Sequence, residues 1–128
     1  MKKPRHDLLT DQELEIMKVV WDRGTVTVRD VYEKLHEGRQ IAYTTVMTMM
    51  GILEQKGHLT RTAGERAYIY RPSEPRRKVI GRMVQDFVTR VFDGSAEPLL
   101  VHLVKNQKLD EAQLAEIEEI VKARRRKK

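Results

Sequence analysis

The sequence predicts a mainly α-helical fold with one small β wing. Three observations lead to this class. Apolar residues recur at helical spacing through most of the chain, capping pairs precede several of these segments, and two short strand-like segments flank a glycine. With 128 residues, the chain has the length of one domain or of a small domain with an appendage. Its core must be mostly aliphatic, because hydrophobic residues make up 40% and aromatic residues only 5%.

Two short helices are predicted near the N-terminus. Thr10 and Glu13 form a capping-box pair, and apolar residues follow at helical spacing until Gly24, which allows a left-handed cap. Thr27 and Asp30 repeat this pair at the start of a second helix. Each helix carries one apolar stripe, so we expect the two helices to pack against a common core.

A third helix, over residues 42–56, has two unlike faces. One face is apolar and suits packing against the other two helices, whereas the opposite face carries Thr44, Thr45, Thr48 and Gly51. No charged residue occurs from position 42 to position 53. Small hydroxyl side chains without carboxylates fit against a polyanion, because threonine can donate to phosphate or contact a thymine methyl group. The alternative is a helix that is buried on all sides.

A basic hairpin follows the third helix. Residues 58–63 and 67–71 are strand-like and meet at a turn that begins with Gly64. Residues 39–71 contain five basic and two acidic residues, whereas residues 1–121 are neutral overall. A basic hairpin beside an acid-free helix is typical of a surface that binds the DNA backbone. Three helices and a hairpin in this order predict a winged helix-turn-helix domain, which we place at residues 7–73.

Residues 74–121 predict three further helices that lack a core of their own. One covers residues 76–92, a short one can be capped by Ser95, and Asp110 with Gln113 caps the last. A segment below about 70–80 residues rarely supplies a stable core alone, so its apolar stripes need a partner. A second copy of the chain is the simplest partner, and folding back on the N-terminal domain is the alternative. The residues expected at this dimer contact are Ile80, Met83, Phe87, Val91, Leu100, Leu103, Leu114, Ile117 and Val121.

The composition argues against several other classes of protein. The absence of cysteine excludes disulfides, thiolate catalysis and cysteine-ligated metals, and the four histidines fall in no metal-ligand motif. No phosphate loop or nucleophile elbow is present, so we expect no enzyme, no metal and no cofactor. No apolar run is long enough for a signal peptide or a membrane span, which predicts a cytoplasmic protein without membrane insertion. The net charge of +6 resides in the basic end 122–128, which we expect to be a disordered tail.

Three stretches resemble the penicillinase-repressor family of winged-helix transcriptional repressors: LTDQELEIMKVVWDRGTVTVRDVYEKL, IAYTTVMTMMGILEQKG and AYIYRP. The most specific pieces are residues 13–21, the string AYTTVMT at 42–48 and the string FDGS at 92–95, and the resemblance covers roughly residues 9–121. It implies a homodimeric repressor of double-stranded DNA that occupies a palindromic operator. In such a repressor the third helix enters the major groove and the wing lies on the backbone.

The resemblance also assigns roles to single residues. The residues implied to face the DNA groove are Thr44, Thr45, Met47 and Thr48, and those implied to meet the backbone are Tyr43, Arg61, Arg66 and Arg71. A membrane sensor with a zinc-protease domain is implied to release the repressor by cutting its C-terminal arm, here between His102 and Leu103. Two alternatives stay open: a winged-helix regulator that senses a ligand, and a winged helix that binds only other proteins.

Overall fold

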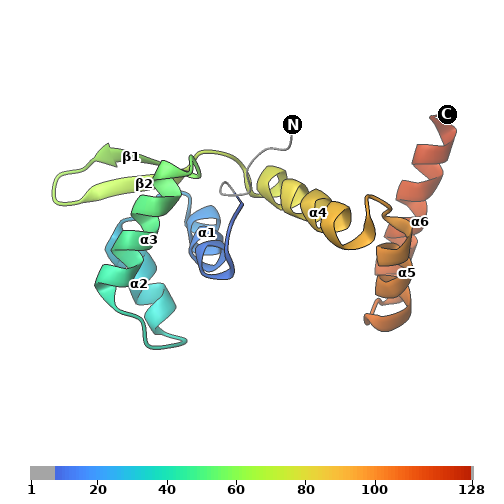
Figure 1. Cartoon of the computed structure of the whole chain (residues 1–128), viewed down its shortest axis with the longest axis horizontal. Coiled ribbons are helices and arrows are strands. Elements are labelled where there is room, and N and C mark those ends of the chain that lie inside the picture. Colours follow the sequence, from blue (N-terminus) through green and yellow to red (C-terminus); the bar gives the residue numbers. More distant parts are fainter. Residues whose placement is uncertain (1–7, 128) are drawn as a thin grey trace. The chain divides into compact units, whose positions relative to one another are not determined.

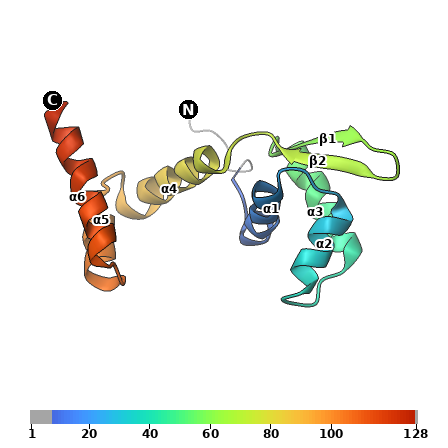
Figure 2. The same cartoon turned by 180° about the vertical axis from the view of Figure 1, so that it is seen from behind.

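The structure is a computed structural model, which describes residues 8–127 (Figures 1 and 2). Residue 7 and residue 128, the outer limits of the predicted domains, lie outside this range. The chain divides into two compact units, one that ends at Met83 and one that begins at Val84. The elements are α1 (Asp11–Arg23), α2 (Val28–His36), α3 (Tyr43–Gln55), β1 (Leu59–Ala63), β2 (Tyr68–Pro72), α4 (Arg76–Phe92), α5 (Glu97–Asn106) and α6 (Glu111–Arg126). The division therefore falls within α4.

Capping boxes begin three of the helices, as the sequence predicts. In α1 the Thr10 hydroxyl accepts the backbone N–H of Glu13 at 3.2 Å, and the Glu13 carboxylate accepts the Thr10 N–H at 2.9 Å. The pairs at Thr27 of α2 and Asp110 of α6 are likewise complete. Each box satisfies N–H groups that a helix cannot satisfy within itself, and this is why short side-chain patterns fix these helix starts.

The first unit has one continuous core to which all of its elements contribute. The helices α1, α2 and α3 pack against one another, and α1 and α2 also pack against β2. The predicted apolar face of α3 is confirmed, since Val46, Met50 and Leu53 have no exposed surface. The buried hydrophobic residues of this core are Leu9, Ile16, Met17, Val20, Val26, Val31, Leu35, Val46, Met50, Leu53, Leu59, Tyr70 and Val79.

The hairpin is antiparallel, with a register from Leu59 opposite Pro72 to Ala63 opposite Tyr68. Its base is attached to the loop after α1, because Val26 and Tyr70 exchange backbone hydrogen bonds of 2.9 and 2.7 Å. The buried ring of Tyr70 adds a packing contact at the same position. The wing therefore starts from a fixed base on the helical core.

The first half of α4 belongs to the first unit. The Trp21 indole N–H donates to the carbonyl oxygen of Glu74 at 3.3 Å, and the Arg82 guanidinium donates to both carboxylate oxygens of Glu74. Val79 is buried in the core, and Met83 packs against it from the side. These contacts attach the start of α4 to α1.

The second unit differs from two sequence expectations. Ser95 does not cap α5: the N-cap position is Ala96, without a side-chain hydrogen bond, and Pro98 occupies the first turn, where its missing N–H costs nothing. The sequence predicts a disordered basic end from residue 122, but α6 continues through Arg126. Arginine and lysine are good helix formers, and their positive charge is favourable at a helix C-terminus.

Candidate nucleic-acid interface

The outer face of α3 is the surface that the sequence predicts to meet DNA. Thr44, Thr45, Met47 and Thr48 are all exposed, and Met47 retains 48% of its surface. At 100° per residue, Thr44 and Thr48 lie opposite the buried face of the helix, and Met47 lies on one edge. The structure therefore excludes the alternative of a helix buried on all sides.

The N-terminus of α3 is free of negative charge. Its N-cap residue, Ala42, makes no side-chain hydrogen bond, and its first turn holds no acidic residue. The positive end of the helix dipole is thus left for an external anion, and a phosphate group is a suitable partner. Tyr43 begins the helix with its ring edge-on to that of Tyr32, 5.5 Å between centroids. This contact holds the predicted backbone ligand Tyr43 at the entry of α3.

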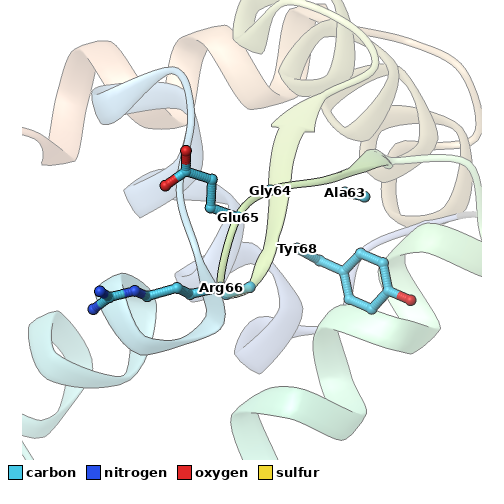
Figure 3. A pocket seen from close by; sticks show the side chains of 6 residues that line it. Ala63, Gly64, Glu65, Arg66 and Tyr68 are labelled. Atoms are coloured by element: carbon cyan, nitrogen blue, oxygen red, sulfur yellow. The ribbon is translucent and has the colours of Figure 1, made fainter.

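The turn of the wing depends on a glycine. The Gly64 N–H donates to the Ala67 carbonyl oxygen at 3.0 Å, and a Cβ at Gly64 would lie only 2.5 Å from that oxygen. A side chain here would force the turn open. Residues 63–68 line a cavity of about 360 Å³, and Figure 3 shows Arg66 and Tyr68 pointing to opposite sides of the wing. Arg66 is therefore presented to solvent at the tip.

Arg61, on β1, contacts two elements of its own chain. Its guanidinium lies 3.5 Å from the Glu54 carboxylate of α3 and 4.0 Å from the centroid of the Tyr68 ring on β2. The side chain thus connects the end of α3 to the wing through an ion pair and a cation–π contact. Arg71 also lies on the wing, exposed and opposite Thr60. Of the three predicted backbone arginines, Arg61 is the one that forms an ion pair with a carboxylate among residues 8–127.

A buried ion pair holds the other end of α3, and sequence reasoning missed it. The Lys56 ammonium donates to the two Glu13 carboxylate oxygens at 2.8 and 3.1 Å and to the Leu8 carbonyl oxygen at 3.2 Å. Burial alone would raise the pKa of Glu13, but hydrogen bonds from Lys56 and Thr10 outweigh it and hold the pKa below its ordinary value. The carboxylate that caps α1 therefore also fixes the C-terminus of α3.

The residues predicted for dimerisation are mostly uncovered in the single chain. Phe87, Val91, Leu100, Leu103, Leu114 and Val121 are exposed, and Ile80 and Ile117 are half-buried. Met83 differs, because it already packs against the core of the first unit. The bond between His102 and Leu103 lies inside α5, where the Asn106 side-chain amide donates to the His102 carbonyl oxygen at 3.1 Å.

Within residues 8–127, no three histidine or acidic side chains come together as metal ligands. Over the same range, no helix combines the length and the apolar character needed to cross a membrane. The candidate DNA surface consists of threonine, arginine and aromatic side chains, together with the backbone of α3 and of the wing turn.

Comparison with known proteins supports the predicted fold. The profile of the penicillinase repressor family matches residues 9–123. The solution structure of the DNA binding domain of the repressor BlaI is similar with a TM-score of 0.51 and 30% identity, over 59% of this chain and 90% of that domain. The winged-helix prediction for the mainly helical chain is thereby confirmed.

Two relatives match over nearly the whole chain. The transcriptional regulator BlaI of Mycobacterium tuberculosis is 36% identical over 117 residues, 86% of this chain and 85% of the relative. The penicillinase repressor of Bacillus licheniformis is 24% identical over 120 residues, 94% of each chain. The family is one of repressors and not of enzymes, in agreement with the sequence expectation. The chain belongs to the penicillinase repressor family of winged-helix, DNA-binding repressors.

Proposed function

We propose that the protein is a homodimeric transcriptional repressor that occupies a palindromic operator in double-stranded DNA. The observation that carries this proposal is the outer face of α3, which is exposed, lined with threonine and free of charge beside a basic wing. In this arrangement α3 enters the major groove with Thr44, Thr45, Met47 and Thr48 at the base edges. Tyr43, Arg61, Arg66 and Arg71 then meet phosphates. Because a repressor acts where its operator lies, we also infer a cytoplasmic location.

The apolar surface of the second unit supports a homodimer. Most of the side chains predicted for dimerisation are exposed in the single chain, and α5 and α6 contain no buried residue. A two-fold dimer would place two α3 helices on half-sites about 10 bp apart, or a multiple of this spacing. Selection of bound fragments from genomic DNA, with sedimentation at micromolar concentration, tests the proposal. An inverted repeat and a dimer are expected; a monomer without sequence preference would refute it.

Replacing one threonine separates base contacts from backbone contacts. We expect Thr48→Ala to change which operator sequence is preferred, with a loss of roughly 1–3 kcal/mol at the base that Thr48 contacts. Thr89→Ala removes an exposed threonine from α4 and is the matched control. Competition binding with single-base variants of the operator measures both. If the two variants keep the same preference, Thr48 does not read the DNA.

We further propose that cleavage between His102 and Leu103 in the C-terminal arm releases the repressor. The agent would be a membrane sensor with a zinc-protease domain. The bond lies inside α5, so this helix must open locally before a protease can cut it. Two α3 helices linked in one dimer bind with high effective concentration. Loss of the link can therefore cost about 10²–10⁴ in affinity without any change at the DNA contact.

A chain that ends at His102 tests this mechanism. It is expected to keep the fold of the first unit, to sediment as a monomer and to lose most of its affinity for the operator. The full chain in the same buffer is the control. If the shortened chain still dimerises and binds as tightly, cleavage is not the switch, and ligand sensing takes its place. If the winged helix binds only other proteins, which is the third possibility, neither the full nor the shortened chain would bind DNA.

A further inference from the structure

A second basic surface lies on the first unit. Lys18, Arg23, Lys34 and Arg76 line a cavity of about 330 Å³ together with Val19 and Asp22. The basic side chains come from the three helices α1, α2 and α4, and Asp22 is the one acidic residue among the six that line the cavity. The cavity therefore concentrates positive charge from segments that are far apart in the sequence.

Most of this charge has no ion-pair partner in the part of the chain that the structure describes. Among residues 8–127, no carboxylate lies within ion-pair distance of Lys18, Arg23 or Arg76. Lys34 contacts Glu37 at 3.4 Å, but both side chains are more than half exposed, so that pair is weak. Like charges around one small volume repel one another, and a bound anion would remove this repulsion.

The part of the cavity that lies on α1 is separated from the candidate DNA surface by the core. On α1, Lys18 and Asp22 lie one turn apart on the side opposite the buried residues Ile16, Met17 and Val20. Those buried residues share the core with the inner face of α3. Because α1 and α3 pack through their inner faces, their outer faces point in different directions. We therefore expect a duplex on the outer face of α3 to leave the α1 side of the cavity open.

We propose that this cavity binds a small polyanion, a molecule with two or more phosphate or carboxylate groups, independently of DNA. The two arginines can each hold two oxygens of one such group, and the two lysines add point charges. The volume lies at the lower end of the range for small-molecule sites, about 300–1,000 Å³. Arg76 is the first residue of α4, the helix that continues into the second unit, so a bound anion would attach the start of α4 to α1 and α2.

Titration calorimetry on the full chain without DNA tests the proposal, with inorganic pyrophosphate and citrate as separate probes at constant ionic strength. The double variant Lys18→Gln, Arg76→Gln is expected to weaken binding about tenfold or more, because charge-assisted hydrogen bonds are lost. The double variant Arg29→Gln, Arg77→Gln removes one charge from a helix surface and one from the first turn of α4. Neither Arg29 nor Arg77 lines the cavity, so this variant is expected to bind pyrophosphate and citrate like the unmodified chain.

Asp22→Asn provides a test that a folding defect cannot imitate, since the proposal expects it to tighten anion binding. Preference for pyrophosphate or for citrate tells whether the site selects phosphate or carboxylate groups. Absence of saturable binding of both probes, or equal weakening in the two double variants, would overturn the proposal. So would a loss of duplex DNA affinity in Lys18→Gln, Arg76→Gln together with absent anion binding, because the cavity would then be a DNA contact. The calorimetric measurements contain no DNA, so the proposed repressor function stands or fails separately.

Discussion

The two units of the chain expose large apolar side chains in different ways. In the first unit, among the described residues, those exposed are Tyr43, Met47, Ile52 and Tyr68, all of them on α3 or the wing. In the second unit they occur on α4, α5 and α6 and comprise Val84, Phe87, Val91, Leu100, Val101, Leu103, Val104, Leu114, Ile120 and Val121. Exposed apolar patches of this kind mark interaction surfaces. The first unit therefore has its own core and, among its described residues, exposes large apolar side chains on one surface only. In the second unit, exposed apolar residues occur on every helix.

This difference has consequences for stability. The first unit buries its apolar residues in one core, so its unfolding should not depend on protein concentration. In the second unit Val88 is the one hydrophobic residue that the structure describes as buried, so its folding should be linked to association. Trp21, the single tryptophan of the chain, lies in the first unit and reports its unfolding separately.

The largest expected effect comes from a charge on the exposed face of α5. Leu103→Glu would bury a carboxylate in the proposed dimer contact, so we expect a monomer with about 10²–10⁴-fold weaker binding to a full palindrome. Binding to an isolated half-site, and the unfolding curve of Trp21, should not change. Sedimentation and binding to matched full-site and half-site fragments measure these quantities.

Gln107→Glu adds the same charge at an exposed polar position just after α5 and serves as the control. It should dimerise normally. A dimeric Leu103→Glu protein, or equal losses at the full site and the half-site, would show that α5 is not part of the dimer contact.

Local structure was predictable from the sequence because its determinants are close together along the chain. Thr10, Thr27 and Asp110 each find their capping partner three residues later, and all three capping boxes form. The hairpin also follows from neighbouring residues, with Gly64 at a turn position where a Cβ would lie only 2.5 Å from a backbone oxygen. Where two local signals competed, at Ser95 and Pro98, the backbone restriction of proline set the helix start, and the hydroxyl group did not cap it.

Contacts between distant residues were not predictable in this way. The Lys56–Glu13 pair joins residues 43 positions apart, and nothing in the pattern around either residue distinguishes it from surface charge. The same holds for the basic cavity, whose lining comes from three helices. The charge pattern located the candidate DNA surface, whereas tertiary packing decides which of its charges are free.

The pair of Glu13 and Lys56 tests whether the first unit holds α3 by itself. Lys56→Met leaves a buried carboxylate without its ammonium partner, so we expect the free energy of unfolding to fall by roughly 3 kcal/mol. Glu13→Gln should lower the free energy of unfolding by less, because the Lys56 side chain is longer than that of Glu13 and its ammonium group can reach water. The double variant should recover part of the loss. Urea unfolding followed by Trp21 fluorescence measures all three, and additive losses would contradict a direct interaction.

The same pair predicts a pH dependence. The folded pKa of Glu13 lies below its ordinary value of 4.5, so its stabilisation is present at neutral pH and is lost as the pH falls from about 4.5 through the lower folded pKa. The pKa of Glu74 is also lowered, by the hydrogen bond from Arg82, so both carboxylates contribute in this range. The stability difference between the unmodified chain and Glu13→Gln isolates Glu13. That difference should shrink below pH 4.5, and a difference independent of pH would contradict the assignment.

The smallest expected effect distinguishes two arginines of the wing. Arg66, at the tip, has no ion-pair partner among the residues that the structure describes, whereas Arg61 is bound by Glu54 and Tyr68. Each phosphate contact contributes about 0.9 to the slope of log affinity against log salt concentration. Arg66→Gln should therefore lower this slope by nearly that amount, and Arg61→Gln by less, since Glu54 already matches part of its charge. Glu54→Gln should raise the slope by freeing Arg61 for phosphate. Operator binding from 50 to 300 mM salt measures all three variants, and equal slopes for the two arginine variants would mean that Glu54 does not restrain Arg61.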